Sequence, residues 1–347
     1  MRYQTYTERL TQLRQAAGKG GWVLRDESQD PSTPFWVAEH PESAHAAPRI
    51  AWSFMHGNEP TGFEALCQWM ALGAPTHNWT LIPLVNPTGI HAFTRLTRDG
   101  IDLNRRAREV GPLEADLLKQ QLQLKPYELA LNLHDQRSIF HPRGQRLPSS
   151  LSVLAPRAQF EHGEMVPDRA CRWAGSMVQW MRAEHPNWGY ARFDDTYYPT
   201  AFGEWVQELG IPTVTVETGI SLQSADRSAV AAALARVVRR VDAANLPPDE
   251  GEAAYWELPK NEATGCDLAL RSGEEVSYWK LMEMLQDGAY ISGLERLLDP
   301  ACPVAYTELE VSSLEFRTLN ERTAWNRADL YTVAGSALRA FAEGLPR

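Results

Sequence analysis

The chain has 347 residues, of which 44% are hydrophobic and 22% charged, and its formal net charge is −10. This composition is typical of a globular protein, and with no basic stripe to offset the acidic charge it excludes general affinity for nucleic acid. No run approaches the roughly 18 apolar residues that a membrane-spanning helix needs. Residues 1–19 lack the apolar core of a signal peptide and resemble an amphipathic helix, so we expect a soluble, cytoplasmic protein without membrane partners.

The cysteines are scattered along the chain and never form a Cys-x-x-Cys pair; they are Cys67, Cys171, Cys266 and Cys302. We therefore expect neither a disulfide framework nor a cysteine-ligated zinc ion. A cytoplasmic setting fits this pattern.

Short apolar runs alternate with helical patterns, which predicts an α/β fold with a mixed, largely parallel central sheet flanked by helices on both faces. The predicted strands are Pro34–Ala38, Arg49–Met55, Trp79–Val85, Glu128–His134, Ser150–Leu154 and Pro212–Glu217. The predicted helices are Thr61–Leu72, Pro112–Leu122, Pro167–Ala183, Thr200–Leu209 and Ser224–Ala243. In such folds, functional side chains gather where strands end at the carboxyl edge of the sheet.

The alternation of apolar runs and helical patterns ends after Ala244, where residues 246–251 (Leu-Pro-Pro-Asp-Glu-Gly) predict a linker or tight loop. We therefore predict a catalytic domain over residues 1–245 and a small α+β accessory region over residues 250–347. Within the accessory region we expect a helix at Glu274–Leu285 and strands at Val304–Val311 and Leu314–Leu319.

A candidate metal-binding turn follows the predicted strand Arg49–Met55. Its sequence from Met55 to Gly62 is Met-His-Gly-Asn-Glu-Pro-Thr-Gly, which places His56 and Glu59 three residues apart. An imidazole and a carboxylate at this spacing can bind one Zn²⁺ from a single turn. By itself the pair is a weak signal with a structural alternative, because His-x-x-Glu also occurs by chance.

His134 supplies a possible third ligand at the end of another predicted strand. Two histidines and one carboxylate leave a coordination position open, as in catalytic rather than structural zinc sites. A metal-bound histidine usually has its second ring nitrogen hydrogen-bonded. Asn132, on the same strand face, or Asp135 could be that partner.

Glu217 closes the β-branched run that begins at Pro212, and it is a candidate general base. Burial would raise the pKa of this carboxyl, and a nearby metal would lower it. It would take a proton from the attacking water and pass it to the departing group. The alternative is a glutamate that only caps the following turn.

Between these motifs lies Asn86-Pro87-Thr88-Gly89 and then a cluster of arginines. They occur in Thr94-Arg95-Leu96-Thr97-Arg98 and in Asp102-Leu103-Asn104-Arg105-Arg106. Guanidinium groups match planar carboxylates in bidentate geometry. Arg98 and Arg106 are the two that surface charge explains most readily.

Together, these motifs from Trp52 to Gly219 resemble the zinc carboxypeptidase family, which includes the succinylglutamate desuccinylases and aspartoacylases; the likeness is to its bacterial members. The resemblance implies a single zinc ion held by His56, Glu59 and His134. It also implies that Glu217 is the base, that Arg95 polarises the scissile carbonyl, and that Asn104 and Arg105 hold the substrate's terminal carboxylate. Tyr197 and Tyr198 are candidates for the family's mobile tyrosine. Asn132 departs from the family, in which many members have aspartate.

The leading hypothesis is a metallocarboxypeptidase that hydrolyses an amide bond beside a free carboxylate, acting on a small peptide. The alternatives are an N-acyl amino acid deacylase, an enzyme that trims cell-wall peptides, and a non-catalytic protein that binds a carboxylate-bearing ligand. In a last alternative, every one of these residues is structural.

Overall fold

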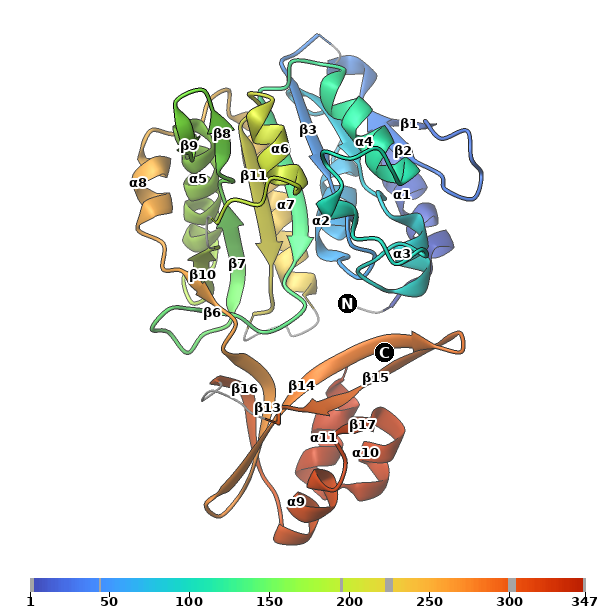
Figure 1. The fold of residues 1–347 in the computed structure, drawn as a ribbon, viewed down its shortest axis with the longest axis vertical. Helices are drawn as coiled ribbons and strands as arrows, with labels where there is room; N and C mark the ends of the chain where they lie inside the picture. Colours follow the sequence, from blue (N-terminus) through green and yellow to red (C-terminus); the bar gives the residue numbers. More distant parts are fainter. Residues whose placement is uncertain (1–2, 44, 194–195, 222–226, 299–303, 346–347) are drawn as a thin grey trace.

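The computed structural model describes residues 3–43, 45–193, 196–221, 227–298 and 304–345. Within these ranges the chain forms a larger α/β unit and a smaller C-terminal unit (Figure 1). No helix among the described residues is long and apolar enough to cross a membrane. Cys302 and the first residues of the helix predicted from Ser224 lie outside the described ranges.

The larger unit is built on an eight-stranded mixed sheet with the order β1-β2-β4-β3-β5-β11-β7-β10. Its strands are β1 (Val23–Asp26), β2 (Trp36–Glu39), β3 (Pro48–Trp52), β4 (Asn78–Ile82), β5 (Leu129–Asp135), β7 (Ser149–Leu154), β10 (Gly189–Arg192) and β11 (Thr213–Thr218). The central strands β4, β3, β5 and β11 are parallel, and β2 and β7 run antiparallel to them. Strand β5 is buried along its whole length, as expected for a central strand covered on both faces.

Helices cover both faces of this sheet, which confirms the predicted layers. One face carries α1 (Tyr6–Gly20), α2 (Thr61–Met70), α5 (Asp168–Glu184), α7 (Ser228–Ala243) and α8 (Glu250–Trp256). The other carries α4 (Leu113–Gln123) and α6 (Phe202–Glu208). Helix α7 shows why: Val230, Leu234, Val238 and Val241 recur at helical spacing and are buried against the sheet. Shorter elements are η1 (Pro41–Ser43), α3 (Pro87–Ala92), η2 (Leu103–Arg105), β8 (Ala158–Phe160) and β9 (Gly163–Met165).

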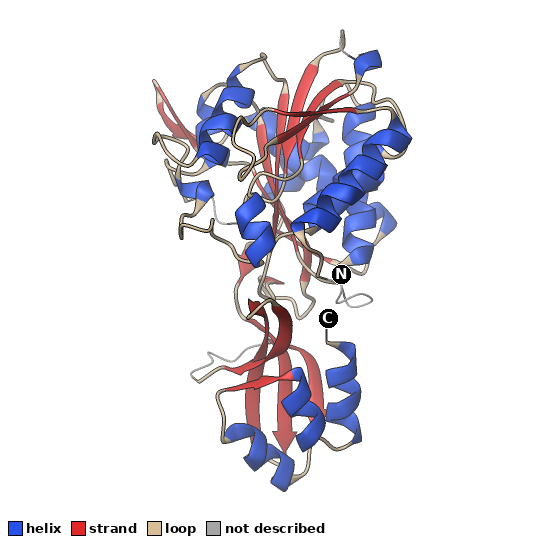
Figure 2. Cartoon of the chain, turned by 90° about the vertical axis from the view of Figure 1, so that its right-hand side faces the viewer, coloured by secondary structure: helices blue, strands red, loops and turns tan. Residues whose placement is uncertain are grey.

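The C-terminal unit has a sheet of its own (Figure 2). It also has a hydrophobic core of its own. Its strands, in the order β16-β13-β14-β15-β17, are β16 (Val304–Glu310), β13 (Gly265–Ser272), β14 (Glu275–Gln286), β15 (Ala289–Arg296) and β17 (Ala324–Asn326). Its helices are α9 (Ser313–Asn320), α10 (Arg327–Val333) and α11 (Ser336–Gly344). Figure 1 shows the unit below the edge where β5 and β11 end.

Two predicted elements of this unit are wrong. Residues Glu274–Leu285 form strand β14 rather than a helix, because β13 and β15 pair with it on both sides. Asp287 and Gly288, with φ of 52° and 76°, make the tight turn into β15, and this pairing overrides the helix propensity of the leucines and methionines. Residues Leu314–Leu319 lie in helix α9 rather than a strand, because Ser312 and Glu315 form a reciprocal cap at its start.

The connection between the units is short. Strand β12 (Asn261–Glu262) pairs with β6 (His141–Pro142) of the larger unit. Helix α8 packs against α5, and the main-chain N–H of Ala155 donates to the Tyr255 hydroxyl at 3.1 Å. These contacts place α8 with the larger unit. The division at residues 245–250 stays a prediction.

Candidate active site

The turn that follows β3 is closely packed and strained. Phe54 has a φ of 54°, a left-handed conformation that bulky residues rarely adopt, and its ring packs against Phe63 with centroids 5.4 Å apart. A Cβ on Gly57 would lie 1.9 Å from the carbonyl carbon of Gly89, so glycine is required where these two turns touch. Asn86 holds the second turn by accepting a hydrogen bond from the Gly89 N–H at 2.8 Å. This packing fixes where the residues after Met55 point.

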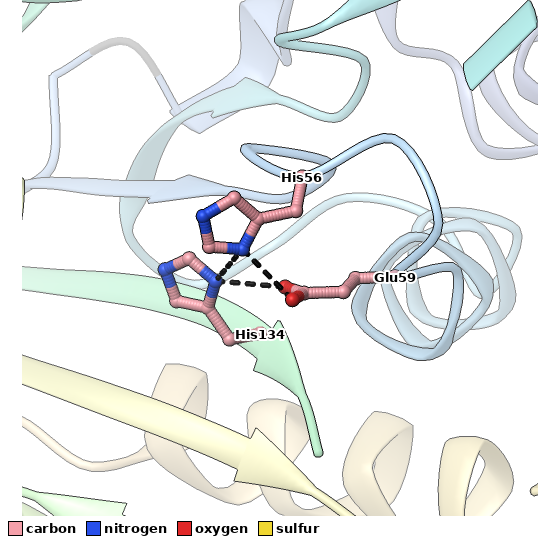
Figure 3. Close-up of side chains that lie close together, drawn as sticks. All are labelled: His56, Glu59 and His134. Atoms are coloured by element: carbon pink, nitrogen blue, oxygen red, sulfur yellow. Dashed lines mark hydrogen bonds and ion pairs between the residues drawn. The ribbon is translucent and has the colours of Figure 1, made fainter. Parts of the chain in front are cut away.

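His56, Glu59 and His134 converge at the carboxyl edge of the sheet. Nδ1 of His56 lies 2.8 Å from one Glu59 oxygen, and Nδ1 of His134 lies 2.8 Å from the other. The two Nδ1 atoms are 3.2 Å apart, and all three side chains are buried (Figure 3). The three residues could hold a metal ion, since their potential ligand atoms lie within 4.8 Å of one another.

Asp102 connects this cluster to Arg95. Its carboxylate accepts a hydrogen bond from Nε2 of His56 at 3.3 Å and from Nε of Arg95 at 3.1 Å. Arg95 in turn places Nη1 3.3 Å from Nδ1 of His56. A carboxylate on the second ring nitrogen fixes the tautomer and orientation of a ligand histidine. His56 therefore presents Nδ1 as the atom that can bind a metal.

The electrostatics of the cluster separate the two histidines. Burial opposes protonation of His56, but Glu59 and Asp102 outweigh it and raise its pKa to about 9. Burial lowers the pKa of His134, only partly offset by Glu59. Burial also disfavours the charged form of Glu59, yet the two histidines hold its pKa well below the usual range. The cluster thus holds one protonated and one neutral imidazole around a carboxylate.

Glu217 lies next to this cluster on the neighbouring strand. It is paired with His134 in the parallel register of β11 and β5. Burial, followed by the charge of Glu59, raises the pKa of Glu217 well above its ordinary value. A carboxyl with raised proton affinity at the edge of a candidate metal site can act as a general base.

Known proteins share the fold of this chain. No protein-family model matches it, and no curated protein has a significantly similar sequence. A solved metallo-carboxypeptidase from Burkholderia cenocepacia is 13% identical with a TM-score of 0.52, over 69% of this chain and 69% of that one. A candidate metallopeptidase from Shewanella amazonensis is 16% identical with a TM-score of 0.51, over 70% of this chain and 94% of that one. The chain has the metallo-carboxypeptidase fold.

On this metallo-carboxypeptidase fold, Asn104 and Arg105 lie in η2, directly after Asp102. Asp102 accepts a hydrogen bond from the Asn104 N–H at 3.0 Å, which joins η2 to the His56 cluster. The Asn104 side chain accepts from the Phe202 N–H at 3.0 Å and so fixes the start of α6. Arg105 is exposed. Its role in carboxylate binding stays a prediction.

The two candidate tyrosines differ in their surroundings. The hydroxyl of Tyr197 donates to Glu208, and the guanidinium of Arg108 lies 3.4 Å from it. The ring of Tyr198 is half-exposed and lies 5.5 Å from the guanidinium carbon of Arg105. Tyr198 is therefore the one placed beside the predicted carboxylate site.

The two arginines that the sequence favours as surface charge differ from Arg95. Arg98 pairs only weakly with its neighbour Asp99 at 3.8 Å, and its side chain is 70% exposed. Arg106 forms an ion pair with Glu109, three residues along the chain. The reading of both as surface residues agrees with these contacts.

The prediction that Asn132 or Asp135 is the hydrogen-bond partner of the second ring nitrogen of His134 is wrong. Among the described residues, Nε2 of His134 has no hydrogen-bond partner. Asn132 shares its strand face but lies two residues, about 7 Å, behind it along the strand. Asp135 faces the other side and accepts hydrogen bonds from the hydroxyls of Thr61 and Thr218, at 2.7 and 2.6 Å. The carboxylate partner in this site is Asp102, bound to His56.

Proposed function

We propose that the protein is a zinc-dependent metallocarboxypeptidase that hydrolyses an amide bond beside a free carboxylate. The observation that carries the proposal is the convergence of His56, Glu59 and His134, with Glu217 in register beside His134. Ligands about 2.0–2.2 Å from a tetrahedral zinc ion lie about 3.3–3.5 Å from one another. The three contacts of 2.8, 2.8 and 3.2 Å are shorter than that spacing by about 0.1 to 0.7 Å, so the same three atoms can hold the ion once the side chains move apart by that amount.

Zinc, when bound, would supply Lewis acidity toward the scissile carbonyl. The Glu217 carboxylate takes a proton from the attacking water and delivers it to the departing nitrogen. The Arg95 guanidinium, held by Asp102, stabilises the negative charge that develops on the carbonyl oxygen. Asn104 and Arg105 bind the terminal carboxylate and so orient the amide for attack.

The test is the Glu217→Gln variant, which keeps the shape of the side chain and removes the base. We expect zinc content of one equivalent per chain in both proteins and loss of peptide hydrolysis in the variant. Arg98→Gln is a control for a charge-removing substitution outside the site, because the Arg98 side chain is largely exposed. Retained turnover in Glu217→Gln, or an unmodified chain that binds no zinc, would refute the proposal. A panel of peptides and N-acyl amino acids then identifies which amide is cleaved.

A further inference from the structure

The Glu217 carboxylate takes its position from the main chain that carries it. Among the described residues, no group makes a hydrogen bond or an ion pair with this carboxylate. The candidate metal ligands differ, because His56, Glu59 and His134 contact one another directly. The place of the candidate base relative to these ligands therefore depends on how firmly the end of β11 is joined to the end of β5.

The ladder between these two strands ends just after Glu217. Its last pairs are Glu217 with His134 and Thr218 with Asp135. Beyond them, the main-chain oxygen of Thr218 accepts a hydrogen bond from the Gln136 N–H at 2.7 Å. Nε2 of Gln136 adds a second link, because it donates to the main-chain oxygen of Glu217 at 2.9 Å. Both peptide groups that follow Glu217 are therefore bound by Gln136.

Arg227 bridges the two strand ends from outside the sheet. Its guanidinium donates through Nη1 to the main-chain oxygen of Thr218, at 2.9 Å, and through Nη2 to that of Gln136. One planar group thus binds one carbonyl from each strand, which the fixed fork of guanidinium donors allows. Because Arg227 directly precedes α7, the bridge also joins both strands to the start of that helix.

The main chain at Arg227 is strained. Its φ is 64°, in the left-handed region that favours glycine. Such conformations persist where the surrounding contacts hold them, and they gather at functional sites. Arg227 stands at the N-cap position of α7, but its side chain makes no capping hydrogen bond. The side chain therefore serves the bridge to β5 and β11 rather than the start of the helix.

Carboxylates from both units stabilise the charge of the bridge. Burial, followed by the charge of Arg137, lowers the pKa of Arg227. Asp135 of the larger unit acts in the opposite direction, as do Glu283 and Asp267 of the C-terminal unit. Glu283 also forms an ion pair with Arg137. The C-terminal unit thus helps to keep two neighbouring guanidinium groups charged at the edge of the candidate active site.

We propose that Arg227 is a positioning residue, which holds the ends of β5 and β11 together and so keeps the Glu217 carboxylate where it can take a proton from the attacking water. The proposal rests on the proposed function, in which Glu217 is the base. Arg227 acts through the main chain of Thr218 and takes no part in the proton transfer. A displacement of about 1 Å can cost about 100-fold in rate, so loss of the bridge should be visible in turnover.

The test is Arg227→Met, which keeps an apolar stem and removes the donors. With the peptide that is cleaved fastest in the panel of amides, we expect kcat to fall about 10- to 100-fold while KM changes less than about threefold. Zinc content should stay at one equivalent per chain, because the three metal ligands hold one another. Arg239→Met, which removes an exposed arginine from α7, is the matched control and should keep full activity.

Chemical rescue separates the bridging donors from a general effect on stability. Arg227 lines a cavity of about 300 Å³ between the units, which gives a small cation access to the place of its guanidinium. A low, non-denaturing concentration of guanidinium chloride should therefore restore part of the kcat that Arg227→Ala loses, whereas the same concentration of sodium chloride should not. Equal effects of the two salts would overturn the role of the donors.

Amide hydrogen exchange of the zinc-loaded proteins tests the bridge without turnover. Arg227→Met should speed exchange over residues 133–137 and 214–221, and Arg239→Met should not. Full kcat in Arg227→Met, or a loss that lies in KM or in zinc content, overturns the positioning role and leaves the proposed function standing. Faster exchange at the strand ends, without hydrolysis of any amide by the unmodified protein, refutes the function and supports the bridge. Unchanged exchange overturns the bridge.

Discussion

Metal binding to the cluster should compete with a single proton, and His56 should be the residue that loses it. In the metal-free protein the pKa of His56 is about 9, because Glu59 and Asp102 stabilise its charged form. His134 has a lowered pKa and is neutral at pH 7, and Glu59 is ionised. A metal ion needs an unprotonated nitrogen, so at pH 7 it must displace the His56 proton.

The size of the effect follows from this pKa. Below pH 9 the zinc affinity should fall about tenfold per pH unit, hence about 100-fold, or roughly 2.7 kcal/mol, from pH 8 to pH 6. Above pH 9 the affinity should level off. The sign follows from the raised pKa, since the proton that competes with the metal is lost only as the pH rises through 9.

The assay is competition with a chelator of known pH dependence, combined with calorimetry in buffers of different ionisation enthalpy to count released protons. It uses the Glu217→Gln variant, so that no proton from Glu217 is counted. Asp102→Asn in that background removes one of the two carboxylates that raise the His56 pKa, and should move the break in the curve to lower pH. A slope near zero or near two between pH 6 and 8 would refute the assignment of a single protonated ligand.

Three further changes test the turn, the substrate site and the packing of α8. Gly57→Ala should destabilise the protein by about 1–3 kcal/mol and lower its zinc content. Its control Gly18→Ala, in open space within α1, should raise the melting temperature. Equal effects of the two variants in thermal unfolding would contradict the contact between Gly57 and the Asn86 turn. Arg105→Ala should raise KM for peptides about 10- to 100-fold while Arg106→Ala leaves it unchanged, and similar Michaelis constants for both variants would remove Arg105 from the site. Tyr255→Phe should cost about 1–3 kcal/mol in denaturant unfolding, because a buried main-chain N–H of the larger unit loses its acceptor; no loss would show that α8 does not depend on that bond.

The central part of the fold could be predicted from sequence because its strands are apolar runs bounded by turn residues. The strands predicted from Pro34 to Glu217 correspond to β2, β3, β4, β5, β7 and β11. The edge strands β1 and β10 are only four residues long and escaped prediction, since a short edge strand has little hydrophobic pattern. Local signals in the C-terminal unit were present but overlooked, namely the Asp287-Gly288 turn and the Ser312 cap.

The site was harder to predict than the fold. His56 and Glu59 follow β3, and His134 lies at the end of the neighbouring strand β5, so the three are close in space, and strand ends can be read from sequence. The role of Asp102 could not be read in that way, because it lies on a loop whose path depends on tertiary packing. A ligand histidine usually has a hydrogen-bond partner on its second ring nitrogen, but this rule does not say which residue of the chain is that partner.

Phe54 shows that the metal site restricts residues that never touch a ligand. Its left-handed backbone favours glycine, whereas its place beside Phe63 favours a large apolar ring. Glycine at position 54 would relieve the backbone but leave a cavity in the core, and a β-branched residue would fill space at a higher backbone cost. Few substitutions satisfy both demands. Position 54 should therefore vary little among sequences that build this turn, and it offers a marker for finding them when the ligand motif alone is too short.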